Sequence, residues 1–164
     1  MNKIEHIINN GNYQLYLHKN ANEEINRPFC SHHFEHLLDV ARITYILLLE
    51  ESSPFISREM AYAAGLLHDI GRWHEYKTET DHAKYSADLA EPILAKAGFP
   101  KAERLLIEKA IEQHRLKEDY LQHRSPLSAA LSKADSLSRL CFRCDARNQC
   151  KKLKQQPYHE GLLY

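Results

Sequence analysis

Apolar residues recur at helical spacing in nearly every segment after residue 30 of this chain, and no segment shows the strict alternation of a half-buried β-strand. Val40, Ile43 and Leu47, for example, fall on one face of a helix. Faces of this kind must be buried against one another. The pattern therefore predicts an all-α fold, a compact bundle of five to seven helices.

Helix start and stop signals indicate the boundaries. Ser31 is a candidate N-cap, Pro54 interrupts the pattern, and Gly98 stands where a C′ residue is expected. The expected helices cover about 31–51, 57–68, 81–97, 100–115 and 125–140, after a weak first helix and a polar lead-in within 1–24. We expect a loop from residue 71 to residue 81, before the third of these helices.

The length of the chain and its charge balance limit the classes of protein to which it can belong. The 164 residues suit one domain, 1–164, with its core at about 30–140 and a cysteine-containing tail, 141–164, packed on that core. The 22 basic and 22 acidic residues balance, so neither a nucleic-acid polymer nor a membrane surface is expected as a partner. The apolar run Ile43–Leu49 is too short to span a bilayer, and no signal peptide is visible, so we expect a cytoplasmic protein. The sequence leaves open whether the protein forms a homo-oligomer.

Several histidines and aspartates lie on the otherwise apolar faces of the expected helices. Helical spacing turns four of them inward, each from a different expected helix: His36, His68, His114 and Asp135. Asp69 follows His68 directly, and His82 opens the helix expected at 81–97. Any one of them, taken alone, is most simply a core residue with its own hydrogen-bond partner. A set of this size needs many such partners, whereas one shared cation cluster satisfies them all. Nitrogen and oxygen ligands without sulfur suit Fe, Mn, Zn, Ni or Co rather than Ca.

The local sequence around these residues resembles a known family. The segments are His36-Leu37-Leu38-Asp39-Val40-Ala41, Ala63-Ala64-Gly65-Leu66-Leu67-His68-Asp69-Ile70-Gly71 and Lys133-Ala134-Asp135. Their order and flanks resemble the HD-domain superfamily of metal-dependent phosphohydrolases, over about residues 30–140. Small stand-alone bacterial HD proteins, including diadenosine-polyphosphate hydrolases, are the most similar subgroup. The resemblance implies the HD-domain form of the helical bundle.

The resemblance also implies a ligand set and a reaction. One metal ion would sit on His36, His68, Asp69 and Asp135, and a second on His82 and His114 with Asp69 bridging. Alternatively, His82 and His114 only orient substrate. Such ions activate a water molecule. Because Asp69 and His68 would hold these ions, they are the expected catalytic residues. The expected reaction is hydrolysis of a phosphate ester or anhydride of a nucleotide or other small phosphorylated metabolite, at one or two metal ions.

Candidate substrate-binding residues lie near these motifs. Arg72 lies three residues after Asp69, and Lys133 lies two before Asp135, so both are candidates for binding phosphate oxygens. His32, one helical turn before His36, is a candidate at the pocket mouth. The alternative for each is a solvated surface position. The segment 72–81, rich in aromatic and charged residues, is expected to rim the pocket.

Four cysteines suggest a second site. Cys141, Cys144 and Cys150 follow the last helix, and Cys30 precedes the first long one. Cys30 lies six residues before His36 and Cys141 six after Asp135, about 9 Å along each helix. If those helices are antiparallel, the four thiols meet, and a structural zinc site would join the tail to the first long helix. Buried or incidental thiols and an iron–sulfur cluster are the alternatives.

Two other functions stay open besides the hydrolase. Some proteins of the HD fold hold two irons in a similar ligand set and oxidise their substrates with dioxygen, and no residue in this chain excludes a di-iron oxygenase. A non-catalytic metal-binding sensor module is the third class. The complete set of ligands, with no position lost, argues against that class.

Overall fold

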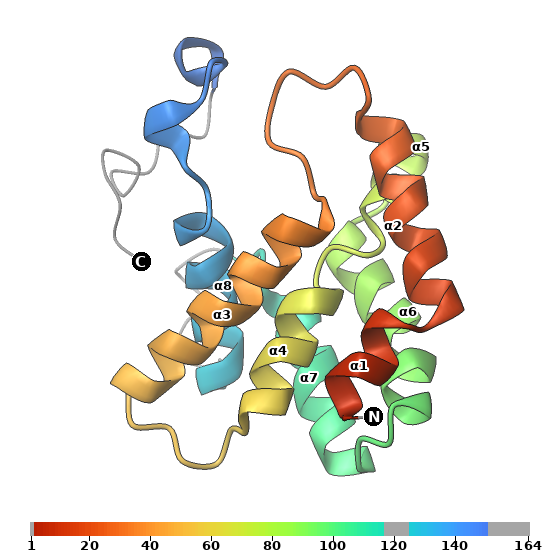
Figure 1. Cartoon of the computed structure of the whole chain (residues 1–164), viewed down its shortest axis with the longest axis vertical. Helices are drawn as coiled ribbons and strands as arrows, with labels where there is room; N and C mark the ends of the chain where they lie inside the picture. The colour runs from red at the N-terminus through yellow and green to blue at the C-terminus, as the bar shows by residue number, and fades with distance from the viewer. Residues whose placement is uncertain (1, 117–124, 151–164) are drawn as a thin grey trace.

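The computed structural model describes residues 2–116 and 125–150 of the chain. Helices and no strands occur within these ranges, which confirms the predicted all-α class (Figure 1). In chain order they are α1 (Lys3–Ile8), α2 (Gly11–Glu24), α3 (Phe34–Glu50), α4 (Arg58–Leu67), α5 (Arg72–Thr78), α6 (His82–Lys96), α7 (Lys101–Gln113), α8 (Pro126–Leu137) and the 3₁₀-helices η2 (Cys141–Arg143) and η3 (Arg147–Gln149). Residues 151–164 of the predicted tail lie outside the described residues.

Helix α4 lies at the centre of the bundle, in contact with α1, α3, α6, α7 and α8 (Figure 1). Helix α3 packs along α4 and α8, and α7 contacts α6, α8 and α4. One hydrophobic core joins these helices, with Leu37, Leu66 and Ile111 among its fully buried side chains. The inward faces predicted from helical spacing therefore meet in one core around α4.

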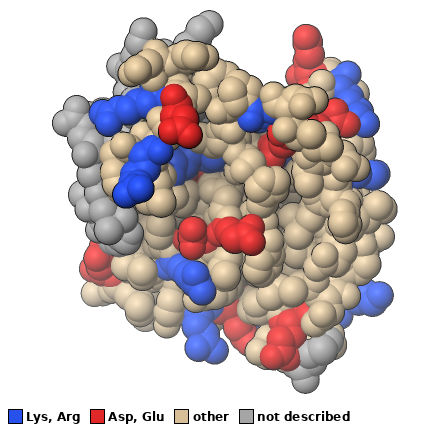
Figure 2. All heavy atoms as spheres, turned by 45° about the horizontal axis from the view of Figure 1, so that its top comes forward, with Lys and Arg blue, Asp and Glu red and all other residues tan. Residues whose placement is uncertain are grey.

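The surface carries charges of both signs. Lys and Arg side chains are interspersed with Asp and Glu on the face that Figure 2 shows. This mixture agrees with the equal numbers of basic and acidic residues in the sequence. Within residues 2–116 and 125–150, no helix combines the length and the apolar character needed to cross a bilayer.

The N-terminal segment is more ordered than predicted. It forms two helices, and the Asn2 and Asn10 side chains cap them by accepting hydrogen bonds from backbone N–H groups of the first turn. The second of these helices, α2, packs against α5. Helix α2, which sequence analysis did not connect with the site, therefore lies beside α5, the helix that follows Asp69.

The predicted start of α3 is wrong by three residues. The helix begins at Phe34, and Ser31 does not cap it; His33 is the N-cap residue and makes no side-chain cap hydrogen bond. The backbone before α3 is held by a distant group instead, because the His32 N–H donates to the Glu24 carboxylate at 2.7 Å. A tertiary contact outweighs the local capping preference here.

Part of the predicted loop at 71–81 is also wrong, because residues 72–78 form the helix α5. Helix α5 packs on α2 and α6, and the Gly71 N–H before it donates to Ser86 Oγ at 2.9 Å. Glu79, with φ of 60°, adopts the left-handed conformation that ends the helix. Helix α8 also ends earlier than predicted, at Leu137.

Gly65 allows α3 and α4 to come into backbone contact. A Cβ atom at this position would lie 2.4 Å from the Cα and 2.5 Å from the backbone nitrogen of Ala41. Such distances are far inside van der Waals contact, so only glycine fits. The close approach places the His36 and His68 rings 5.6 Å apart, centroid to centroid.

We predict that Gly65→Ala destabilises the protein by about 3 kcal/mol or more, because α3 and α4 must separate to admit the methyl group. Gly11→Ala is the matched control, since nothing lies within 4 Å of a Cβ there, and its effect should stay within about 1 kcal/mol. Urea unfolding of the variants measures both. Equal stability of the two variants would contradict the close contact of α3 with α4.

Candidate metal centre

The structure brings together all six of the predicted histidine and aspartate ligands. They form two groups, and within each group one ligand atom per residue lies within 4.8 Å of every other. The groups are His36, His68, Asp69 and Asp135, and Asp69, His82 and His114. Asp69 belongs to both, which is the position predicted for a bridging ligand.

Five of the ligands come from the end or the inner face of a helix, and Asp69 lies in the short turn between α4 and α5. His36 lies on α3 and Asp135 on α8, while His68 is the C-cap residue of α4. His82 is the first residue of α6, and His114 is the C-cap residue of α7. Five helices therefore converge on one point, and the distances between their ligands are fixed by helix packing rather than by a flexible loop.

Asp69 is the centre of the cluster. Its Oδ1 lies 2.8 Å from His82 Nε2 and 3.6 Å from His114 Nε2, and its Oδ2 lies 3.4 Å from His68 Nε2. Asp135 Oδ1 lies 3.2 Å from His36 Nε2 and 3.8 Å from His68 Nε2. The two carboxylates thus share the His68 imidazole between them.

Hydrogen bonds set the orientation of two of the imidazoles. His68 Nδ1 donates to the Gly65 carbonyl at 2.7 Å, and His114 Nδ1 donates to the Ile111 carbonyl at 2.6 Å. A carbonyl oxygen can only accept, so in the neutral ring Nδ1 holds the hydrogen and Nε2 keeps its lone pair. Both lone pairs then point towards carboxylates.

A cation fits this arrangement. His68 is 0% and Asp69 2% exposed, yet His68 Nε2 and Asp69 Oδ1 have no hydrogen-bond partner among the described residues. Buried polar atoms without partners are rare, and electron-pair donors that face one another repel unless positive charge lies between them. Imidazole and carboxylate donors without sulfur suit Fe, Mn, Zn, Ni or Co.

The electrostatics lead to the same conclusion. Burial disfavours the charge on Asp69, but His68, His82 and His32 outweigh it and hold the pKa of that carboxyl well below its usual range. Burial also disfavours an imidazolium at His68, yet the neighbouring Asp69 and Asp135 raise its pKa to about 10. The cluster attracts a proton strongly when no other cation is present. A bound metal ion would take the place of that proton.

Three further ligands, His36, His114 and Asp135, have pKa values shifted towards the protonation states that metal binding needs. Burial lowers the pKa of His36 to about 4, in spite of its hydrogen bond to Asp135, and burial also lowers the pKa of His114. Arg139, with His36 and His68, keeps the pKa of Asp135 well below its usual range against the effect of burial. Neutral imidazoles and ionised carboxylates are the forms that bind divalent ions.

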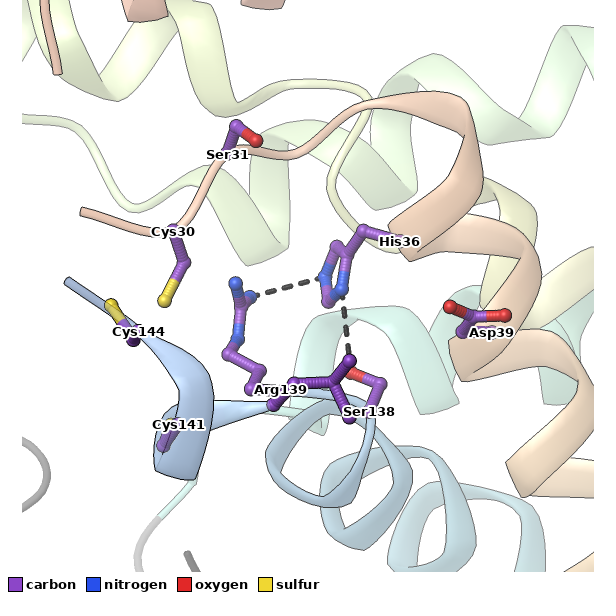
Figure 3. A pocket seen from close by; sticks show the side chains of 9 residues that line it. Cys30, Ser31, His36, Asp39, Ser138, Arg139, Cys141 and Cys144 are labelled. Carbon is purple, nitrogen blue, oxygen red and sulfur yellow. Dashed lines mark hydrogen bonds between the residues drawn. The ribbon is translucent and has the colours of Figure 1, made fainter. Parts of the chain in front are cut away.

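Two largely buried guanidinium groups flank the cluster. Arg139 Nη2 lies 2.9 Å from Asp135 Oδ1 and 3.1 Å from His36 Nε2 (Figure 3). Arg72 Nη1 lies 3.0 Å from both ring nitrogens of His82. Arg72, a predicted substrate-binding candidate, is therefore at the site. Lys133, the second candidate, is exposed, because a rotation of about 200° on α8 separates it from Asp135.

His32 lies deeper than predicted. It is 3% exposed rather than open at a pocket mouth, and its Nε2 lies 3.5 Å from Asp69 Oδ2. Its Nδ1 donates a hydrogen bond to Glu24, and the same carboxylate accepts hydrogen bonds from the His32 N–H and, at 2.7 Å, from Tyr76 Oη. A buried carboxylate thus fixes the histidine that faces Asp69.

Sequence reasoning missed Glu24 and its neighbour on α2, Asn20. The Asn20 side chain donates to the Asp69 carbonyl at 2.9 Å and accepts from the Trp73 N–H at 2.7 Å. Tyr13, Asn20 and Glu24 are all buried, and their spacing places them on one helical face. That polar stripe on an otherwise weak helix is the signal that could have identified them.

The cysteines form a looser group. Cys30, Cys141 and Cys144 line a cavity of about 260 Å³ together with His36 and Arg139 (Figure 3). All four cysteines are free, and no three of their sulfur atoms lie within 4.8 Å of one another. Cys30 and the segment after α8 do meet at one end of the bundle, as the antiparallel arrangement predicted. A zinc site on these thiols stays a prediction.

We predict that Glu24→Ala destabilises the protein by about 3 kcal/mol, because it removes the buried carboxylate that accepts hydrogen bonds from the His32 backbone and ring and from Tyr76 Oη, and leaves these buried donors without an acceptor. Glu23→Ala is the control on the neighbouring residue; it breaks a surface pair with Lys77 at 2.9 Å and should change stability by about 1 kcal/mol or less. Chemical unfolding in the presence of a chelator measures both, and equal costs would contradict the role of Glu24.

We predict that divalent ions raise the Tm of metal-free wild-type protein by several degrees, since ligands that bind only the folded state stabilise it. Asp69→Asn should abolish this shift, because the amide cannot supply the charge shared by both groups. His18→Ala, which changes an exposed histidine on α2, should keep it. Thermal unfolding with and without Mn²⁺ or Zn²⁺ makes the measurement. A full shift in Asp69→Asn would place the ion elsewhere.

Comparisons with known proteins agree with this site. The family model described as HD domain matches residues 33–140, which include the six ligands. An uncharacterized protein of Clostridium beijerinckii is 35% identical over 150 residues, or 92% of each chain. The crystal structure of a predicted HD superfamily hydrolase from an uncultured Thermotogales bacterium is 28% identical, with a TM-score of 0.57, over 76% of this chain and 66% of that one. This chain therefore belongs to the HD domain family of metal-dependent hydrolases.

Proposed function

We propose that this protein is a phosphohydrolase that cleaves a phosphate ester or anhydride of a nucleotide or another small phosphorylated metabolite. One observation carries the proposal: a buried histidine–aspartate cluster has a guanidinium on each side, with Arg139 beside Asp135 and Arg72 beside His82. Arginine matches the geometry of phosphate oxygens better than any other side chain. Fixed positive charges at a metal centre favour an anionic substrate over a neutral one.

The roles of the ligands follow from their grouping. His36, His68, Asp69 and Asp135 would hold one ion, and Asp69, His82 and His114 a second. When bound, such ions supply Lewis acidity and lower the pKa of a nearby water. The helix ends that carry these side chains keep them in place, so little rearrangement accompanies the reaction.

The arginines would bind the substrate. Arg139 lines the cavity of about 260 Å³ that opens beside His36, and a guanidinium has more N–H donors than its contacts to Asp135 and His36 use (Figure 3). Arg72 would act from the other side of Asp69.

His32 would orient water or substrate beside Asp69. Because its Nδ1 faces Glu24, its Nε2 keeps a lone pair directed at the Asp69 side of the cluster. From that position the imidazole accepts a hydrogen bond from a water molecule or a substrate hydroxyl. Glu24 is the positioning residue in this pair, since it contacts His32 and not the metal ligands.

The test is hydrolysis by metal-free protein reloaded separately with Mn, Co, Zn, Ni and Fe, measured both as inorganic phosphate release and by chromatography of the nucleotide products. The substrate panel contains nucleotides, dinucleoside polyphosphates and simple phosphomonoesters. We expect turnover with at least one metal, without oxygen, and background rates for Asp69→Asn. Oxygen uptake by the iron form without hydrolysis of any substrate would instead support the di-iron oxygenase. Metal binding with neither activity would support a binding or sensor module, and both outcomes would overturn the proposal.

We predict that Arg72→Ala lowers kcat/KM for the phosphorylated substrate by about 10- to 100-fold, the effect of losing charged hydrogen bonds worth 1.5–3 kcal/mol. Lys133→Ala, which removes an exposed cation from α8, should stay within about twofold of wild type. Metal content is measured alongside, so that loss of the ion is separated from loss of substrate binding. An unchanged kcat/KM in Arg72→Ala would exclude this role.

A further inference from the structure

Four cysteines lie at the end of the bundle where the chain enters α3 and leaves α8. Cys30 precedes α3, Cys141 opens η2, Cys144 is the C-cap residue of η2, and Cys150 is the C-cap residue of η3. None of them is in a disulfide. The residues of the metal centre explain none of these thiols, because neither histidine–aspartate group includes a cysteine.

The segment from residue 141 to residue 150 carries three of these thiols on two successive turns. The Cys144 N–H donates to the Cys141 carbonyl, the Arg147 N–H to the Cys144 carbonyl and the Cys150 N–H to the Arg147 carbonyl, at 3.2, 3.1 and 3.2 Å. Cys144 and Cys150, the residues that end η2 and η3, have extended backbone. A short, tightly turned segment therefore holds Cys141, Cys144 and Cys150 close together along the chain.

The fourth thiol faces this segment from the other part of the chain. Cys30 lines the same cavity as Cys141 and Cys144, and Figure 3 shows the Cys30 and Cys144 sulfur atoms directed into the space between the two segments. Burial, and then the nearby thiols of Cys30, Cys150 and Cys144, raise the pKa of Cys141. The Cys30 carbonyl is itself held by Arg27 Nε at 3.1 Å.

Little else in the structure holds the segment 141–150 in place. Its helices η2 and η3 are three residues each and pack chiefly against each other. Of its residues only Ala146 is buried. Short helices of this kind are not stable on their own, so a cross-link is the expected source of their order. Four thiols in two chain segments are the groups that could supply one.

We propose that Cys30, Cys141, Cys144 and Cys150 bind one zinc ion, which joins the segment before α3 to the segment after α8. Four thiolates at the usual Zn–S length of about 2.3 Å lie about 3.8 Å apart. The sulfur atoms are more widely spaced than this, since no three lie within 4.8 Å of one another. Rotation about a Cα–Cβ bond between staggered rotamers moves a sulfur atom by about 3 Å, so the sulfur positions can change without movement of the backbone.

The charges around the thiols suit such a site. Zinc with four thiolates carries a net charge of −2, and the cavity that the thiols share also contains Arg139, which lies two residues before Cys141 (Figure 3). The same guanidinium contacts Asp135 and His36. The zinc ion would therefore also fix the position of Arg139 at the edge of the HD metal centre.

The experiment measures zinc in the full chain in an Asp69→Asn background, where the HD centre is disabled. We expect about one zinc per chain that resists brief chelation, and its loss in Cys144→Ser and in Cys150→Ser. Ser31→Ala, a change in the same cavity, is the control and should keep the zinc. Cobalt substitution should give the intense visible absorption of tetrahedral cobalt–thiolate in the parent and not in the cysteine variants.

Two readouts separate this site from a general loss of folding. Helix content should be unchanged in Cys144→Ser, while limited proteolysis should cut the segment 141–150 in that variant and leave it intact in the Ser31→Ala control. Zinc retained by folded Cys144→Ser would overturn the proposal. So would iron with labile sulfide in protein purified without air, or a disulfide between two of these cysteines.

Discussion

The burial of the Asp69 carboxylate is the constraint on which the rest of the structure depends. An ionised carboxylate inside a protein is costly unless positive charge or several donors surround it. Here the surrounding groups are imidazoles that reach it from separate parts of the chain: His32, His68, His82 and His114. Two of these rings are locked by backbone carbonyls with a lone pair facing inward. Metal binding follows as the way in which this set is stabilised.

Helix packing brings the ligands to their distances. Gly65 lets α4 touch the backbone of α3 at Ala41, and that contact sets how near His68 comes to His36. Glu24, on α2, fixes His32 beside Asp69 Oδ2, the oxygen that His68 also faces. The site thus depends on the close packing of α3 on α4 and on the buried hydrogen bond between Glu24 and His32.

Helical periodicity was sufficient to predict the inward set, because a period of 3.6 residues decides which side chains share a face whatever the tertiary structure. The same rule could have excluded Lys133, which lies two residues from Asp135 and so points away. Periodicity could have placed Glu24 on the buried face of α2, but not its role. That role and the true start of α3 depend on a contact between α2 and His32 that no local pattern encodes. Helix α5 was missed because its stability comes from packing on α2 and α6 rather than from its own composition.

The most direct test of the central claim is a crystal structure of the protein grown with Mn²⁺, with anomalous scattering measured at the manganese edge. The account predicts one peak among His36, His68, Asp69 and Asp135, and a second, if two ions bind, among Asp69, His82 and His114. Both peaks should vanish in crystals of Asp69→Asn. Peaks away from Asp69, or peaks that persist in that variant, would contradict the account.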